Sequence, residues 1–289
     1  MTKLTKDAAA DILSHLLNTL EYPPQERHRR RYSSLVSGNE KALQEYLFSC
    51  IQPEVFETFN QSALPSWASL RKLNEKKAPP ADTAGVYVNI IRGTDGYDRM
   101  YVGQTGRLSQ RIKQHMNFRY RRDNKSLHYH AVEHSSWNNF IILATTPPPS
   151  GSQPAWLRGN GLELVLNILE MWCALMFRTL PRSTLEDWLP EKTLTNGNVQ
   201  WYGLNLALPL DQGVPESTPR EDFGAAMRSS PDPLARNYAN GAGYMPKAIP
   251  HPAQPDAASV TDQPALAAST VALFAFAVGF FAGSLWAKK

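Results

Sequence analysis

The chain has 289 residues and is 42% hydrophobic, which is enough to build a real core. Its net charge of +4 and its pI of about 9.0 mildly favour an anionic partner, either nucleic acid or a membrane surface. The two cysteines, Cys50 and Cys173, exclude a disulfide framework and lack metal-ligand spacing, so we interpret them as free thiols in a reducing compartment. The N-terminal MTKLTKDAAADIL has no uninterrupted apolar run and does not predict a secretory signal peptide.

Residues 1–80 are predicted to form a polar, helical N-terminal region. Apolar residues recur at helical spacing in TKDAAADILSHLLNTL (5–20), and a Pro-Pro pair then stops that helix. Two further short helices are predicted at 39–50 and 53–61. The basic run RHRRRY (27–32) could bind phosphate or act as a nuclear localisation signal, but we favour a solvated loop.

Residues 81–208 are predicted to form a globular domain, which begins after the break KKAPPADTA. Runs rich in β-branched and aromatic residues predict three strands, at 85–92, 99–105 and 140–146. The loop GTDGYD makes the first two strands an antiparallel hairpin. Helices are predicted at 107–120 and, very apolar and ended by a proline, at 161–180. The segment WYGLNLALPL closes the globular part.

The last eighty residues are predicted to hold a linker and a membrane anchor. Residues 209–267 are Pro-rich, with ten of the chain's 22 prolines between Pro209 and Pro264, and predict a disordered linker. Residues 268–289 are predicted to hold one transmembrane helix, because 270–287 carry no charge in 18 positions. The alternative is a buried core helix, which would normally show a polar face.

The predicted membrane helix suggests a location and a partner. We expect a single-pass, tail-anchored protein whose body faces the cytosol, in the mitochondrial outer membrane, the endoplasmic reticulum or the nuclear envelope. A homodimer could form through Gly279 and Gly283, which lie on a stripe of small residues four apart, Ala275 to Ala287. Alanine and glycine are common in membrane helices, and we favour that simpler interpretation of the stripe.

The stretch YVGQTGRLSQRIKQH, residues 101–115, ends a strand and opens a helix. Arg111 and His115 are four residues apart and share one helix face, with Arg107 on the same side. Two such groups do not pair with each other and would converge on an anion, which favours phosphate because the guanidinium is a planar fork of donors. The alternative is a solvated amphipathic face whose buried side holds Leu108 and Ile112.

The apolar helix at 161–180 carries Glu163, Asn167 and Glu170 on one stripe. A buried carboxylate is costly unless it is paired or binds a metal, so the stripe either meets a cation or lines a cleft. Glu163 lies near the helix N-terminus, where the helix dipole favours a carboxylate. We therefore assign a structural role to Glu163 and a functional role to Glu170.

The segment NFRYRRDNKSLHYH, residues 117–130, interleaves cations with aromatic rings. Such cations can follow phosphates while the rings stack on bases. Residues 85–140 hold nine Lys or Arg against four Asp or Glu, so the excess of positive charge is concentrated here. The predicted nucleic-acid-binding residues are Arg107, Lys113, Arg119, Arg121, Arg122 and Lys125. A solvated basic loop is the alternative.

Taken in order, GVY (85–87), YVG (101–103), Arg111, His115, Glu170 and the asparagine of YGLNLA resemble a GIY-YIG nuclease domain. The resemblance spans about 85–208, with valine in place of isoleucine in both triplets and a longer segment at 119–160. It implies a small three-stranded antiparallel sheet flanked by helices. It also implies hydrolysis of DNA phosphodiester bonds with a divalent metal.

The resemblance also implies catalytic roles for individual side chains. Glu170 would hold one Mg²⁺ or Mn²⁺, leaving positions open for a phosphate oxygen. Arg111 would bind the scissile phosphate and stabilise charge in the transition state. Tyr87 would orient or help deprotonate the attacking water, while Tyr101 and His115 would hydrogen-bond the phosphate and assist proton movement.

Asn205, the last residue of the resemblance, would anchor the end of the domain against the site. A tyrosine in a strand, a lone histidine or an asparagine can also serve packing alone. The function predicted from the sequence is a membrane-tethered, metal-dependent endonuclease acting on nucleic acid, DNA above all. The alternative is a catalytically inactive nucleic-acid-binding or protein-interaction module displayed on a membrane.

Overall fold

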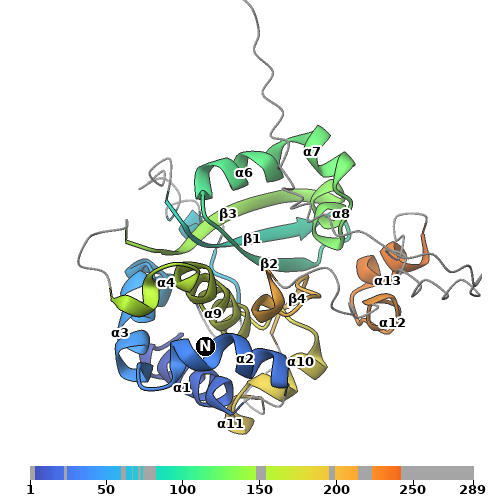
Figure 1. The fold of residues 1–289 in the computed structure, drawn as a ribbon. Coiled ribbons are helices and arrows are strands. Elements are labelled where there is room, and N and C mark those ends of the chain that lie inside the picture. Colours follow the sequence, from blue (N-terminus) through green and yellow to red (C-terminus); the bar gives the residue numbers. More distant parts are fainter. Residues whose placement is uncertain are drawn as a thin grey trace, which may run out of the picture. The chain divides into compact units, whose positions relative to one another are not determined.

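The computed structural model describes residues 4–22, 25–59, 63–66, 68–70, 73, 83–147, 154–194, 199–213 and 223–241. Helices lie on both faces of one mixed four-stranded sheet, so the protein is α+β (Figure 1). The predicted membrane helix and its small-residue stripe lie outside the described residues. In the part of the chain that is described, no helix is both long and apolar enough to cross a membrane.

The N-terminal region is helical, as the sequence predicts. Its helices, in chain order, are α1 (Lys6–Glu21), α2 (Glu26–Val36), α3 (Glu40–Cys50) and α4 (Pro53–Thr58). The Thr5 hydroxyl caps α1 by accepting a hydrogen bond from the Ala8 amide at 3.1 Å. The expected loop at 27–32 is wrong, because these residues lie in α2 and bury Tyr32 against the core. Arginine is a good helix former, which favours a helix over the arginine-rich run. The run is followed by Leu35 and Val36, which are buried in the same helix and would not be expected in a solvated loop.

The sheet contains β1 (Gly85–Gly93), β2 (Asp98–Thr105), β3 (Ser135–Thr145) and β4 (Trp201–Gly203), in the order β3-β1-β2-β4. The three predicted strands are present, and β1 pairs antiparallel with both β2 and β3. The fourth strand pairs parallel with β2, so the sheet is mixed rather than three-stranded and antiparallel. A strand of three residues is too short to leave an alternating pattern in the sequence.

The two faces of the sheet carry different side chains. Val86, Val88 and Ile90 of β1 enter the main core with α9 (Gly161–Met176) and the N-terminal helices. Tyr87 and the residues in phase with it point to the opposite face. There the sheet is covered by α6 (Leu108–Met116) and α8 (Leu127–Glu133) (Figure 1). Because α9 lies between the sheet and α1, nearly all its side chains are buried, which explains its continuous apolar sequence.

The predicted helix at 107–120 is broken into two. Asn117 ends α6 and caps α7 (Phe118–Asp123), since its Oδ1 accepts hydrogen bonds from the amides of Arg119 and Tyr120 at 2.9 and 3.2 Å. Short segments complete the fold, namely η1 (Ala155–Leu157), α10 (Arg182–Trp188), α11 (Glu191–Leu194) and η2 (Pro209–Asp211).

Part of the predicted linker is ordered. Residues 223–241 form α12 (Phe223–Arg228) and α13 (Pro233–Asn240), which pack Met227, Leu234 and Tyr238 against α8 and Ile91. The expectation of disorder from 209 to 267 is therefore wrong for these residues and for η2. Proline suggested disorder, but Pro233 stands in the first turn of α13 behind an Asp232 cap, where proline suits a helix.

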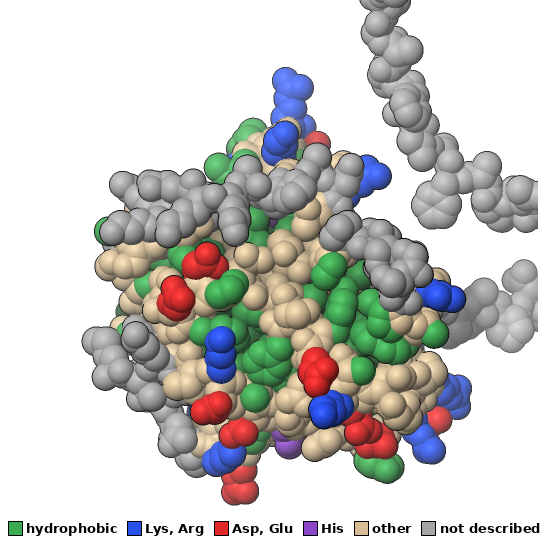
Figure 2. All heavy atoms as spheres, turned by 90° about the vertical axis from the view of Figure 1, so that its left-hand side faces the viewer, with side chains coloured by type: hydrophobic (Ala, Val, Ile, Leu, Met, Phe, Trp, Pro, Cys, Tyr) green, Lys and Arg blue, Asp and Glu red, His purple; other side chains and the backbone are tan. Residues whose placement is uncertain are grey.

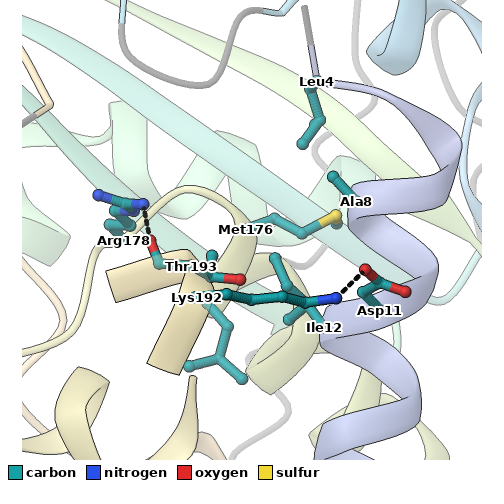
Figure 3. Close-up of a pocket in the computed structure, with 9 residues that line it drawn as sticks. Leu4, Ala8, Asp11, Ile12, Met176, Arg178, Lys192 and Thr193 are labelled. Atoms are coloured by element: carbon teal, nitrogen blue, oxygen red, sulfur yellow. Dashed lines mark hydrogen bonds and ion pairs between the residues drawn. The ribbon is translucent and has the colours of Figure 1, made fainter. Parts of the chain in front are cut away.

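A small cavity lies between α1, the C-terminal end of α9 and α11 (Figure 3). Lys192 donates to Asp11 at 2.7 Å across its rim, and Arg178 donates to the Thr193 carbonyl at 2.6 Å. The first bond fastens α11 to α1, and the second fastens it to the segment after α9. The cavity lies at the C-terminal end of α9, and none of the predicted site residues lines it.

Candidate active site

Tyr87 and His115 form the centre of the site. The Tyr87 hydroxyl of β1 lies 2.5 Å from Nε2 of His115 on α6, and both side chains are buried. Burial, followed by the charges of Arg111 and Arg121, lowers the pKa of His115 to about 3, and burial raises the pKa of Tyr87. The imidazole is therefore neutral at pH 7 and shares one hydrogen bond with the tyrosine hydroxyl.

Gly103 makes room for this pair. It lies directly across the strand pair from Tyr87, and a Cβ at this position would collide with the Tyr87 hydroxyl. The glycine of the YVG triplet is therefore required by the close approach of a tyrosine on the neighbouring strand. This is a physical reason for both triplets to occur together.

Tyr101 of β2 lies beside Tyr87 and is stacked on His128 of α8, with ring centroids 4.0 Å apart and planes inclined by 10°. His128 is buried and its Nε2 lies 3.0 Å from Nδ2 of Asn89. Burial lowers the pKa of His128 well below its usual value, so it too is neutral. The sequence analysis missed His128, although it lies in the aromatic and basic segment at 117–130.

Arg111 is half-buried on α6 and bonds only neutral partners. Its guanidinium donates to the Tyr120 hydroxyl at 3.0 Å and to the Gln114 side chain at 3.3 Å. Within the described residues it forms no ion pair with a carboxylate. It lines a cavity of about 330 Å³ with Tyr101, His115, Tyr120, His128 and Tyr129. A cation without a counter-ion in a cavity is suited to bind an anion.

Glu170 reaches the site from the other face of the sheet. It is buried on α9, and its Oε2 accepts a hydrogen bond from the Gln212 side chain at 2.5 Å. Burial raises its pKa to about 8, opposed by hydrogen bonds from Gln212 and Gln104 and by the charge of Arg111. Burial is also the main cause of the raised pKa of Tyr101, and the Glu170 carboxylate adds to it. The acid, the cation and the tyrosines thus act on one another electrostatically.

Asn205 shows how an acid on one face can meet tyrosines on the other. Its side chain accepts from the Val102 amide at 2.9 Å and donates to the Val102 carbonyl at 2.8 Å. The pairing of β2 with β4 ends at Met100, so Asn205 takes the place of a neighbouring strand at this point. Beyond it, Gln104 of β2 donates to the Gln212 side chain, which also donates to Glu170, so this end of β2 connects the acid with the strand that carries Tyr101.

A short strap covers Glu170. Gln212 follows η2, and its carbonyl accepts a hydrogen bond from Asn167 at 3.2 Å. The strap is held by α2, because Asp211 bonds Arg27 and His28 at 2.8 Å each. Much of the basic run at 27–32 is thus occupied by contacts within the protein. Glu163, to which we assigned a structural role, pairs with another arginine of this run, Arg31, at 3.1 Å.

The predicted nucleic-acid-binding residues lie on α6, α7 and the turns beside them. Arg121 is half-buried and donates to the His115 carbonyl at 2.8 Å, which gives it a structural contact. Arg122 bonds the neighbouring Asp123 at 2.9 Å. The remaining side chains are exposed, namely Arg107, Lys113, Arg119 and Lys125.

The donors around Glu170 are compatible with a hard divalent cation. One carboxylate, the amide oxygens of nearby glutamines and added water suit Mg²⁺, which often takes one or two carboxylates and a substrate phosphate. Among the described residues no group of three or more His, Cys, Asp or Glu is placed to hold a metal ion, so Glu170 would be the main protein ligand. A cation would have to displace the proton on Glu170 and share the carboxylate with Gln212.

No protein-family model, curated protein or solved structure matches this chain. The functional argument therefore rests on the geometry and electrostatics of these side chains.

Proposed function

We propose that the chain is a metal-dependent endonuclease with a GIY-YIG-type domain, acting on nucleic acid and on DNA above all. The observation that carries the proposal is the position of Arg111, which faces a cavity beside the hydrogen-bonded Tyr87–His115 pair and has no carboxylate partner among the described residues. Glu170 lies close enough to influence the pKa values of both site tyrosines. This combination of cation, hydroxyl groups and acid suits hydrolysis of a phosphodiester.

The side chains have complementary roles in this proposal. Arg111 binds a non-bridging phosphate oxygen and stabilises the charge that develops there in the transition state. Tyr87, held by its hydrogen bond to neutral His115, accepts a hydrogen bond from the attacking water and so orients it. Tyr101, held by the stacked His128, borders the same cavity. Glu170 would hold a divalent metal, which when bound supplies positive charge to the reacting phosphate.

The test is cleavage of labelled duplex, branched and single-stranded DNA by the full chain in detergent, with Mg²⁺, Mn²⁺ or EDTA. We expect metal-dependent cleavage that falls at least about 100-fold in Glu170→Ala and in Arg111→Ala. Glu163→Ala is the matched control, because it removes an exposed carboxylate two turns before Glu170 on the same helix and should leave cleavage unchanged. Full cleavage by Glu170→Ala would refute the proposal.

One observation favours the alternative, a catalytically inactive nucleic-acid-binding or protein-interaction module. The carboxylate that should hold the metal is buried, and its Oε2 is occupied by Gln212. Salt-dependent DNA binding without cleavage under any divalent metal would support the module. The same assay therefore separates the two functions.

We also propose that residues 270–287 tether this body to a membrane, with the body in the cytosol. The uncharged apolar length of that segment supports the proposal. Protease digestion of sealed mitochondria and microsomes that contain the full chain is the test. Digestion of the body is expected, and its protection would reverse the orientation.

A further inference from the structure

Two of the four large hydrophobic side chains that are well exposed in the described residues lie at one corner. Met116 ends α6 and is 59% exposed, and Phe118 begins α7 and is 60% exposed. The corner lies at the top of Figure 1, and Figure 2 shows hydrophobic and basic side chains protruding together at that end. Two exposed apolar side chains grouped at one corner can be buried when a partner binds, so the pair suggests a contact.

The corner is held in one conformation. Asn117 caps α7 through two hydrogen bonds, and Arg121 donates from α7 to the His115 carbonyl at the end of α6. Phe118 is therefore presented at a fixed angle between two short helices. A side chain positioned in this way loses little conformational entropy when a ligand packs against it.

The charge around the corner selects the class of partner. Residues 107–125 contain seven Lys or Arg and one acidic residue, Asp123. The exposed cations nearest Phe118 in the sequence are Arg119 and Arg122. An exposed aromatic side chain with cations nearby is suited to bind a nucleic acid. Its phosphates would contact the cations while a base stacks on the aromatic ring of Phe118. A lipid surface is a poorer match, because interfacial helices have a wide apolar face rather than two side chains.

The corner is also connected to the candidate active site. Tyr120 of α7 accepts a hydrogen bond from Arg111 at 3.0 Å and lines the same cavity. Phe118 is two residues before Tyr120 on the same short helix, so the two side chains leave the helix on different sides while their backbones stay close. An unstacked base and the scissile phosphate would then belong to the same short stretch of strand.

We infer that Phe118 is a wedge that stacks on an unpaired base on the same short stretch of strand as the cleaved phosphate. The preferred substrate is then a nucleic acid with unpaired bases, such as a bulge, a branch or a junction of single and double strands. Uniform duplex would bind more weakly, because a base pair must first be broken. The inference rests on the proposed function for the phosphate at Arg111.

The test measures binding, so that it does not depend on cleavage. The full chain in detergent and EDTA is titrated with a bulged duplex that carries 2-aminopurine at the unpaired position, and with the fully paired duplex. We expect wild type to prefer the bulge by about tenfold and to change the 2-aminopurine fluorescence. Phe118→Ala should lose this preference and the fluorescence change, while Phe118→Trp retains both. Tyr97→Ala, which removes another exposed aromatic, is the matched control and should behave as wild type.

The outcomes separate the wedge from the nuclease. Equal affinity of wild type for bulged and paired DNA, or a preference that survives Phe118→Ala, would overturn the wedge even if Glu170-dependent cleavage is found. A Phe118-dependent preference without any cleavage would keep the wedge and reject the nuclease.

A second readout tests lipid contact. Phe118→Cys, labelled with an environment-sensitive dye, is inserted in phosphatidylcholine–phosphatidylserine nanodiscs; Cys50 and Cys173 are buried, so the label should be selective. We expect a response to bulged DNA only. A blue shift in nanodiscs without DNA would mean that the corner rests on lipid and would overturn the proposal.

Discussion

Arg99 and Glu170 are both buried ionisable residues, but their surroundings differ. Arg99 on β2 forms a two-point ion pair with Asp232 at 2.6 and 2.8 Å and a second ion pair with Asp95 at 2.6 Å. Glu170 on α9 has no cation within hydrogen-bonding distance in the described residues, and a neutral amide from Gln212 caps it. The charge of Arg99 is fully compensated within the fold, whereas the charge of an ionised Glu170 is not.

This difference distinguishes a structural charge from a functional one. A buried charge that has its full set of opposite partners fastens elements together, as Arg99 fastens α13 to the sheet. A buried carboxylate without a cation destabilises the folded state and shifts its pKa, so its presence needs another reason. Metal and phosphate binding would supply that reason for Glu170. Three changes to these side chains test the comparison.

Removing the partner of Arg99 should have the largest effect on stability. Asp232→Ala leaves the guanidinium buried with one carboxylate, and it also removes the cap that accepts from the Leu234 amide. We expect a loss of about 3–5 kcal/mol in the free energy of unfolding, measured by urea denaturation. Cleavage per folded molecule should be unchanged, since the pair lies outside the site.

Asp95→Ala is the matched control, because Asp95 is the more exposed partner of the same arginine. It should cost only about 1 kcal/mol, as Arg99 keeps its buried ion pair. Equal losses in the two variants would show that burial of the pair does not matter. A loss of cleavage per folded molecule in Asp232→Ala would assign this region to function.

Glu170→Gln should change how stability depends on pH. The folded pKa of about 8 is above the ordinary value of 4.5, so between these values the unfolded chain loses a proton that the folded chain keeps. The free energy of unfolding therefore falls as pH rises from about 4.5 to 8, by a few kcal/mol from this group. The variant lacks this contribution, so its stability relative to wild type should grow from pH 5 to pH 8.

The comparison between variant and wild type matters because other groups titrate in the same range. The lowered pKa of His115 acts in the opposite direction, adding stability as pH rises toward 6.5, and it cancels in the difference. Urea midpoints at pH 5, 6.5 and 8 measure the effect. A difference that stays constant across this range would mean that Glu170 is ionised in the folded protein and is compensated by a charge.

Much of the fold around β1 and β2 could be predicted from the sequence, because runs of β-branched and aromatic residues and the GTDGYD turn are local signals. The short strand β4 and the ordered helices at 223–241 could not. Both depend on tertiary contacts, β4 on its pairing with β2 and α13 on the ion pair with Arg99. Proline content indicated disorder there because composition does not register a distant arginine.

The candidate site also contains residues that local sequence patterns could predict and residues that they could not. The spacing of Arg111 and His115 and the stripe on α9 are local, and the residues they single out do lie near the tyrosines. His128 and Gln212 were missed because each reaches the site from an element whose position depends on packing. No pattern in the sequence indicates that a glutamine 42 residues after Glu170 will cap its carboxylate.

Gln212→Ala should have the smallest effect of the three changes. It tests directly how readily the Glu170 carboxylate binds a metal ion. In the folded protein Gln212 occupies Oε2 of Glu170, so a divalent cation must compete with a hydrogen bond. Losing one hydrogen bond to a charged group is worth about 1.5 kcal/mol, which corresponds to about a tenfold gain in Mg²⁺ or Mn²⁺ affinity. Calorimetric titration at pH 9, above the pKa of about 8, measures this with Glu170 already ionised.

Gln52→Ala is the control, because Gln52 donates a comparable hydrogen bond at 2.9 Å to Thr145 of β3, and β1 separates β3 from the β2 strand that carries Gln104 beside Glu170. Its metal affinity should equal that of wild type. Weaker metal binding in Gln212→Ala would make Gln212 a supporting donor that orients the carboxylate instead of a competitor. In that case the strap held by α2 would be part of the metal site. The surroundings of Glu170 would then no longer contrast with those of Arg99, because each charged group would have partners that stabilise it.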